Sequence, residues 1–465
     1  MRDAVVHQLL QALGSKKVST DAADLAATSH DTWPVATTWA KLGRHPHAGD
    51  VLVRATGEQD VVDVLAIASS ASTPVTVRAL GSSVTGQPIP VRGGIVLDVS
   101  GLPHTCQVDD VDLTVTVSAS YNGGALEDEL AARGLTLGHS PQSLYRSSVG
   151  GWLATLATGQ FSSLYGGIED LVVGYRVVLA TGEAIDLRAR PRAAMGPDLR
   201  QLFLGSEGTL GIITSVTLKV FRAPEVRLVE TFAVPTVGAG LAIMREQVQS
   251  GLRPFLSRFY DADEARHAMA DPDVTTPVMF VGAQGAAGAA ALEMSALRRI
   301  AEDHGATSLG EAGAGAWMDR RFDFSGVENL LATPGGYAET IEVAHTWRHI
   351  EAFYLDLKAA LEPLADEVLG HFSHVYPQGT SLYVILLGRA TDDEHALDRL
   401  TEIWRTAMRV GLENGAELSH HHGGGLARSP YARASLGDAH LLLRKLKGAL
   451  DPAGILNPGK LGLLD

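Results

Sequence analysis

Four stretches rich in glycine and small hydroxyl residues constrain the fold of this chain more than any other feature. They are residues 78–86, 138–152, 165–170 and 205–212, in the part of the chain where many of its 50 glycines gather. Glycine lets the backbone turn with a positive φ or approach a ligand closely. Together the stretches place small residues where backbone lies flat against a large planar ligand.

The first stretch follows a small βαβ unit. Residues 51–54 and 74–78 have the pattern of strands, and residues 58–71 have apolar spacing of helical period. The turn over 78–86 then exposes several backbone N–H groups on one side, which is how a nest binds a pyrophosphate. A tight turn without a ligand is the alternative, because GxGxxG is absent and no Rossmann-type helix follows.

The length of 465 residues predicts at least two domains. Residues 4–29 read as helical, and residues 137–167 read as a long loop. After Pro224, two strand-helix-helix-strand blocks to about residue 387 predict an α+β domain on an antiparallel sheet. The other expected elements are strands over 94–98, 113–117, 171–179 and 211–220, a hairpin turn at 181–182 and a helix over 122–133.

Composition excludes several classes of protein. A 45% hydrophobic and 20% charged chain is globular, and a net charge of −15 disfavours nucleic acid and anionic membranes as partners. Cys106 is the single cysteine, so a disulfide within the chain and a cysteine-based metal cluster are both excluded, and a cytoplasmic location fits best. No apolar run reaches about 18 residues, so we expect no integral membrane segment.

Polar residues outside these stretches are candidates for chemistry. His420, His421 and His422 are consecutive and do not share one face of a helix or strand, so we expect no metal site there, and a polar loop is the alternative. Imidazoles can also move protons near pH 7. The fork of Arg258 suits a phosphate or carboxylate, unless Arg258 simply forms a surface ion pair with Asp261.

Three motifs carry a resemblance to a known family. SSVGGW at 147–152, YGGIEDLV at 165–172 and GSEGTLGIIT at 205–214 are similar to the alkyldihydroxyacetonephosphate synthase family. That family belongs to the vanillyl-alcohol oxidase and p-cresol methylhydroxylase superfamily of FAD enzymes. The resemblance implies an α+β fold, with a two-subdomain FAD-binding domain over 1–224 and a substrate (cap) domain with an antiparallel sheet over 225–425. Residues 426–465 would return to the flavin domain.

The resemblance also assigns residues to a site. Arg258, Tyr383 and the histidines His420, His421 and His422 would be catalytic, and we expect a nearby cation to lower the pKa of Tyr383. FAD would bind without a covalent link, since residues 75–95 contain no His or Cys. We expect a side chain at Gly150 or Gly208 to collide with it. The residues expected to bind FAD are Arg78, Ala79, Gly81, Ser82, Ser83, Val84, Thr85, Gly86, His139, Ser143, Ser147, Ser148, Gly150, Gly151, Trp152, Tyr165, Ile168, Glu207, Gly208, Gly211 and Ile212.

The activity implied is a redox-neutral exchange of an acyl group for an alkyl alcohol through a flavin N5 adduct. Its substrates would be a small phosphate ester and a lipid alcohol, and the family tends to form homodimers. A FAD-dependent oxidase or dehydrogenase of an alcohol or D-2-hydroxy acid is the alternative, and a flavoprotein without activity is a third reading. His421-His422-Gly423 replaces the Glu-His-Gly typical of hydroxy-acid dehydrogenases, but Gly424 to Ala427 stand where the synthases have a basic stretch.

Overall fold

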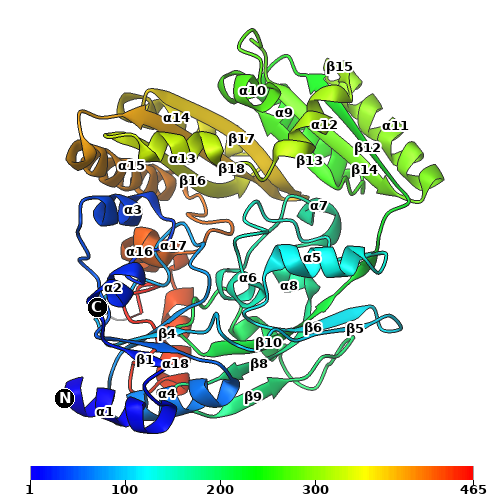
Figure 1. The fold of residues 1–465 in the computed structure, drawn as a ribbon. Helices are drawn as coiled ribbons and strands as arrows, with labels where there is room; N and C mark the ends of the chain where they lie inside the picture. Colours follow the sequence, from blue (N-terminus) through cyan, green and yellow to red (C-terminus); the bar gives the residue numbers. More distant parts are fainter. Residues whose placement is uncertain (1, 464–465) are drawn as a thin grey trace.

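The computed structural model describes residues 2–463 and divides them between three main sheets (Figure 1). Two smaller sheets lie in the half of the molecule that contains both chain ends, and a seven-stranded sheet lies in the other half. We call the first half the flavin half, after the FAD-binding domain that the resemblance predicts there, and the second half the cap. No helix in residues 2–463 is long and apolar enough to cross a membrane.

The first small sheet contains the predicted βαβ unit, with one strand inserted. β2 (Val51–Arg54) and β3 (Val75–Arg78) both pair in parallel with β4 (Ile95–Asp98), which lies between them. Helix α4 (Glu58–Ser70) connects β2 to β3 and buries its apolar face. The predicted helix over 4–29 is wrong in its middle, because β1 pairs with β2. That segment and its continuation consist of α1 (Arg2–Leu13), β1 (Val18–Ser19), α2 (Ala22–Ala27) and α3 (Pro34–Lys41).

The second sheet is antiparallel, with strand order β5-β6-β10-β8-β9. The predicted loop over 137–167 is wrong in part, because it contains two short helices, α6 and α7. Ser148 begins α6 by accepting a hydrogen bond from the Gly151 amide at 3.3 Å, and two glycines in this helix hide its apolar period. The elements are β5 (Cys106–Asp109), β6 (Thr114–Ser118), α5 (Gly123–Ala131), β7 (Leu135–Thr136), α6 (Val149–Thr155), α7 (Ser162–Tyr165), α8 (Ile168–Leu171), β8 (Val172–Val178), β9 (Ala184–Leu187), η1 (Leu199–Leu202), β10 (Ile212–Lys219) and β11 (Phe221–Arg222).

The cap sheet is antiparallel throughout, as predicted, with order β15-β12-β14-β13-β17-β18-β16. The predicted pair of helices is found between β15 and β16, but single helices separate the strands from β12 to β15 and β17 joins β18 directly, so the prediction of two such blocks is wrong in part. Its strands are β12 (Val226–Ala233), β13 (Leu256–Tyr260), β14 (Val278–Gly285), β15 (Thr307–Gly310), β16 (Gly336–Thr346), β17 (Glu367–Tyr376) and β18 (Gly379–Arg389).

Helices cover the two faces of the cap sheet unequally. A large apolar core that includes Phe259, Phe372 and Trp404 packs four helices on one face. The other face packs two helices through Phe280 and Trp317, and it also meets Phe161 of the flavin half. The four helices on the first face are α9 (Val237–Gln249), α11 (Ala287–Asp303), α14 (Ile350–Leu361) and α15 (Asp393–Asn414). The two helices on the other face are α10 (Ala262–Met269) and α12 (Ala312–Arg320). The remaining helices of the cap are α13 (Ser325–Ala332) and η2 (Glu362–Leu364).

The C-terminal residues run back beside the flavin half, where α18 is drawn in red (Figure 1). The Val75 amide donates to Ile455 O, and the Asn457 amide donates to Val75 O, each at 2.8 Å. The Asn457 side chain donates to the carbonyls of Gln87 and Glu207 at 3.1 and 2.7 Å. The tail thus ties two of the glycine-rich stretches together. Its helices are α16 (Gly425–Arg428), η3 (Ser429–Tyr431), α17 (Ala432–Leu436) and α18 (Ala439–Leu450).

Candidate active site

A row of polar side chains crosses four neighbouring strands of the cap sheet. Tyr260 on β13 pairs with His371 on β17, His371 pairs with Tyr383 on β18, and Tyr383 pairs with Glu342 on β16. Directly paired residues project from the same face of an antiparallel sheet. These four side chains therefore share the face turned toward the flavin half, and Arg258 joins them from two residues before Tyr260.

Arg258 is buried and fixed by two neighbours. Its Nε donates to Tyr260 Oη and its Nη2 to His371 Nε2, each at 2.9 Å. His371 Nδ1 lies 2.9 Å from Glu264 Oε2, so the proton on this ring belongs on Nδ1. No hydrogen bond within residues 2–463 involves Arg258 Nη1, which leaves one amino group available to an anionic ligand.

The alternative ion pair between Arg258 and Asp261 does not form. Asp261 accepts instead from Lys358 Nζ at 2.7 Å and from Tyr354 Oη at 2.8 Å. Asp261 also begins α10 by accepting from the Glu264 amide. Arg258 is therefore not paired with Asp261, and its guanidinium group lies in the row of polar side chains.

Tyr383 lies at the centre of the row. Its Oη is 2.9 Å from His421 Nε2 and 3.3 Å from His374 Nε2, and its ring stacks on His371 with centroids 4.4 Å apart. Burial, assisted by the charge of Glu342, raises the pKa of Tyr383 well above its usual value, although Arg258 opposes this. The expectation of a lowered pKa was therefore wrong, and Tyr383 is a neutral phenol that can donate a proton.

His374 reaches this site through a defect in β17. Its φ is +55°, and the pairing of β17 with β18 shifts register between Ser373 and Val375. Strict alternation would turn His374 away from the face of His371, and a bulge of this kind re-aims a side chain. Its ring stacks on His420 with centroids 5.2 Å apart. The sequence analysis missed His371 and His374, and the signal was two histidines three residues apart in a strand.

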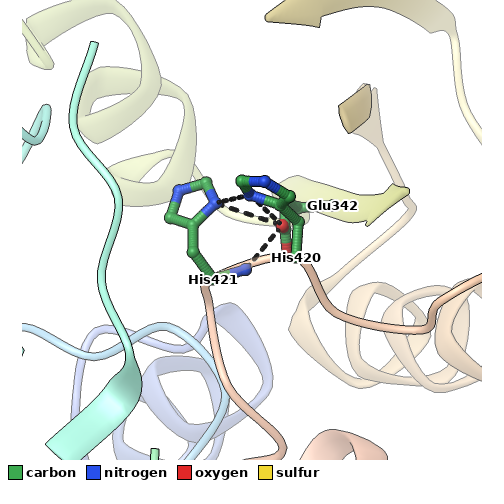
Figure 2. A group of neighbouring side chains, drawn as sticks. All are labelled: Glu342, His420 and His421. Carbon is green, nitrogen blue, oxygen red and sulfur yellow. Dashed lines mark hydrogen bonds and ion pairs between the residues drawn. The ribbon is translucent and has the colours of Figure 1, made fainter. Parts of the chain in front are cut away.

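The triple histidine divides into two parts (Figure 2). The rings of His420 and His421 are nearly perpendicular, and their Nδ1 atoms are 2.8 Å apart. Both lie beside Glu342 Oε1, at 3.7 Å from His420 Nδ1 and 3.2 Å from His421 Nδ1. His422 Nδ1 is buried and has no hydrogen-bond partner within residues 2–463.

Glu342, which the sequence analysis also missed, is completely buried beneath these rings. Burial favours its neutral form, but His421, His422 and Arg428 outweigh this and hold its pKa well below the usual value. The carboxylate accepts from the His421 amide at 2.8 Å. A carboxylate in an apolar strand, between Ile341 and Val343, was the signal in the sequence.

Hydrogen bonds connect the histidine loop to the flavin half. Thr85 Oγ1 and Gln87 Nε2 donate to His422 O at 3.2 and 2.7 Å. The Glu207 carboxylate accepts from the amides of Gly424 and Gly425, at 2.6 and 3.0 Å. Glu207, predicted to contact FAD, therefore also holds the loop that carries the histidines.

The turn over 78–86 fits a phosphate group. None of the amides of residues 79–85 donates a hydrogen bond to another residue in the described part of the chain. The Asp31 carboxylate fixes the end of the turn by accepting from Ser83 Oγ and the Gly86 amide, each at 2.8 Å, and Arg78 Nη1 donates to His30 O. Unpaired amides on a fixed turn can bind the oxygens of a pyrophosphate.

Buried polar atoms near the second stretch fit a ligand with a polar edge. Both ring nitrogens of His139, Ser140 Oγ and Gln160 Oε1 are buried and have no partner within residues 2–463. Each such atom costs about 1–3 kcal/mol unless a ligand or water satisfies it. Burial lowers the pKa of His139 to about 3, so this ring is neutral. These groups fit the heteroatoms of a flavin.

Two of the predicted glycines face protein instead of ligand. A Cβ on Gly150 would lie 2.6 Å from Ala119 Cβ, and one on Gly208 would lie 2.5 Å from Val77 Cγ1. The expected collision with FAD is therefore replaced by a collision with Ala119, directly after β6, or with Val77 of β3. FAD contacts at these positions would come from the backbone.

Other predicted FAD-binding residues have structural contacts of their own. Ser147 Oγ accepts from Trp152 Nε1 and donates to Ser143 O, each at 2.8 Å. Tyr165 Oη accepts from Gln284 of the cap at 2.6 Å. Ile168 and Ile212 are buried in two apolar cores, and Gly211 packs against Val177 and Phe203. Their contacts with FAD remain predictions.

The fold and this site define a class. Residues 49–188 match the FAD binding domain, and residues 223–461 match the C-terminal domain of FAD linked oxidases. The chain therefore belongs to the FAD-linked oxidase family, and FAD is its cofactor.

Individual relatives differ in the reactions that their names describe. The chain is 30% identical to an uncharacterized FAD-linked oxidoreductase, YgcU of Escherichia coli K12, over 98% of both chains. It is 26% identical to alkyldihydroxyacetonephosphate synthase of Trypanosoma brucei brucei, over 99% of this chain and 81% of the relative. The structure of p-cresol methylhydroxylase with substrate bound has the same fold, with a TM-score of 0.82, 17% identity and coverage of 99% and 97%.

Proposed function

We propose that this flavoenzyme exchanges an acyl group for an alkyl alcohol without net redox change, as alkyldihydroxyacetonephosphate synthase does. One observation carries the proposal: His421 stands between the neutral phenol of Tyr383 and the ionised carboxylate of Glu342. Such an imidazole can take a proton from carbon next to a carbonyl while the carboxylate stabilises the imidazolium that forms. Bound FAD supplies an electron-accepting ring system to the substrate.

Each residue of the row has a part in this chemistry. Arg258 presents Nη1 to an anionic group of the substrate and orients it. Tyr383 Oη donates to oxygen on the reacting carbon, and His421 holds the abstracted proton until the product takes it back. The bond between the reacting carbon and the acyloxy oxygen breaks, so the fatty acid leaves as its carboxylate, and the alcohol oxygen forms the replacing bond to that carbon while its proton passes to solvent.

One observation favours an oxidase or dehydrogenase as the second candidate. Arg428, the first basic residue after the histidines, is buried and donates to Gly423 O and Glu342 O, each at 2.8 Å. Both terminal nitrogens of Arg428 therefore already donate to backbone carbonyls instead of a phosphate. Arg258 Nη1 alone suits a carboxylate as well, and a hydride transfer from a D-2-hydroxy acid needs only such an anchor and a base.

An anaerobic experiment separates the two reactions. Acyl-dihydroxyacetone phosphate with a fatty alcohol, and in a second sample D-2-hydroxy acids, are added to the oxidised enzyme. We expect fatty-acid release without lasting loss of flavin absorbance in the first sample, and no bleaching in the second. Rapid bleaching by a hydroxy acid, with no acyl release, would establish the oxidoreductase instead.

Two subsidiary properties belong to the proposal. FAD is bound without a covalent link, so acid-precipitated protein loses its yellow colour, and colour that stays with the precipitate would point to His139 or the histidine loop as the attachment point. The enzyme forms a homodimer in the cytoplasm. Light scattering during size-exclusion chromatography would then give twice the mass of one chain.

A further inference from the structure

Three ligand atoms from two distant segments converge beside the row (Figure 2). His420 Nδ1 and His421 Nδ1 come from the loop after α15, and Glu342 Oε1 comes from β16. The two nitrogens are 2.8 Å apart, and the oxygen lies 3.7 and 3.2 Å from them.

These separations match the coordination distances of a small metal ion. Three atoms so placed lie on a circle of about 1.9 Å radius, and an ion slightly out of their plane is about 2.0–2.1 Å from each. Zinc–nitrogen and zinc–carboxylate bonds have about this length. The geometry therefore accommodates an ion with little movement of the ligands.

The Nε2 atoms of both rings have hydrogen-bond partners, and these partners leave the Nδ1 atoms free to bind a metal ion. His420 Nε2 lies 2.7 Å from Tyr376 Oη, and His421 Nε2 lies 2.9 Å from Tyr383 Oη. When each Nε2–H donates to its tyrosine, both Nδ1 lone pairs and the carboxylate point into one space and repel unless a cation lies between them. Metal-binding histidines are oriented by hydrogen bonds of this kind.

The ligands are also fixed before any ion binds. Glu342 has no exposed side-chain surface, and the side chains of His420 and His421 are 9% and 10% exposed. The hydrogen bond from the His421 amide to Glu342 Oε1 holds the loop on the strand. Arg428 Nη2 is 3.5 Å from the other carboxylate oxygen, which leaves Oε1 for the ion.

We propose that Glu342, His420 and His421 form a binding site for one divalent transition-metal ion of the zinc type. Two imidazoles and one carboxylate leave a fourth position for water or a substrate oxygen, as in zinc sites that are not purely structural. The sequence analysis expected no metal because three consecutive histidines do not converge. The structure instead combines two of them with a carboxylate 78 residues before His420.

The site itself does not depend on the proposed function. The effect of the ion on activity does depend on the proposed function, because an ion on His421 Nδ1 prevents that nitrogen from accepting a proton. Zinc should therefore inhibit the acyl exchange.

Zinc stoichiometry tests the proposal directly. The FAD-loaded protein is treated with chelator, equilibrated with Zn²⁺ alone, freed of unbound ion by gel filtration and measured by elemental mass spectrometry. We expect one zinc ion per chain in the wild type, and at least about 10-fold weaker binding in His420→Ala and Glu342→Gln. His304→Ala is the matched control, since its imidazole pairs with Glu246 on the surface at 2.7 Å, and it should bind zinc as the wild type does.

Two results would overturn the proposal: no zinc retained by the wild type, or zinc retained equally by wild type and His420→Ala. Flavin absorbance and circular dichroism report whether each variant is folded. If Glu342→Gln does not fold, His420→Ala decides alone, because His420 is at the edge of the cluster. Failure of the acyl exchange would leave the zinc stoichiometry unaffected, so the two proposals fail separately.

Discussion

The polar groups on the two sides of the candidate active site differ in whether they have hydrogen-bond partners within the protein. On the cap side, Arg258, His371, Tyr383 and Glu342 find hydrogen-bond partners among one another and their neighbours. On the flavin side, His139 has two buried ring nitrogens with no partner within residues 2–463, and neighbouring loops contain further atoms of this kind. Folding alone positions the proposed catalytic groups, whereas the buried polar atoms on the flavin side have no partner from the described part of the chain.

The largest expected effect tests the cap side alone. Tyr383→Phe, His421→Ala and Arg258→Ala should each lower kcat/KM by about 100-fold or more, the usual scale for loss of an acid-base group. FAD content, measured by the ratio of flavin to protein absorbance, should not change. Tyr337→Phe is the control in the same sheet, since its Oη donates to Leu364 O away from the row. Full activity in all three variants would show that the site is misplaced.

Removal of FAD should change the hydrogen-exchange rates of the two sides by different amounts. A cofactor present at 100 times its Kd stabilises by about 2.7 kcal/mol, so its loss should speed hydrogen exchange in residues 139–160 by up to about 100-fold. Strands β17 and β18 should change much less, because His371 and Tyr383 already have protein hydrogen-bond partners without FAD. Exchange measured by mass spectrometry with and without FAD checks this. Equal acceleration on both sides would contradict the comparison.

A smaller effect should follow from loosening Arg258 indirectly. In Glu264→Gln the amide no longer fixes the proton of His371 on Nδ1, so the hydrogen bond from Arg258 Nη2 weakens. We expect KM for the anionic substrate to rise about 10-fold with kcat less affected. Glu367→Gln, which removes an exposed carboxylate paired with His267, should leave both constants unchanged. If Glu264→Gln lowers only kcat, positioning of the substrate anion is not its role.

The smallest effect concerns a second buried carboxyl on β16. Burial raises the pKa of Glu339 to about 8, with Trp404 and Thr340 as its hydrogen-bond donors, whereas the neighbouring histidines and Arg428 hold the pKa of Glu342 well below its usual value. Because the unfolded chain releases this proton near pH 4.5, Glu339 lowers stability as the pH rises from about 4.5 to 8.

Glu339→Gln removes this titration. The Tm of the wild type should therefore fall relative to that of the variant by a few degrees between pH 6 and pH 8, measured by scanning fluorimetry. Parallel Tm curves for the two proteins would mean that Glu339 is already ionised at pH 6.

Much of the flavin half could be predicted from the sequence. Strands such as 51–54 and 94–98 follow from short runs of apolar residues. The small-residue stretches identify the FAD-binding domain because glycine is required where the backbone turns sharply. Helix α6 was missed because Gly150 and Gly151 interrupt its apolar period.

The residues of the cap side were identified only in part. Arg258, Tyr383 and the three histidines came from motifs, and so their chemical types were determined by the sequence alone. Glu342, Glu264 and His371 were missed because their partners are distant in the chain, and only the register of β13, β17, β18 and β16 aligns them.

What the sequence by itself determined is the fold family, the cofactor and the kinds of groups available for chemistry. Tertiary structure alone decided which of those groups meet and in which protonation state. The bulge at His374 depends on pairing with β18, and the opposite pKa shifts of Tyr383 and Glu342 depend on burial and on charges brought from other segments. Motifs record local backbone requirements, whereas burial and cross-strand register are properties of the folded chain as a whole.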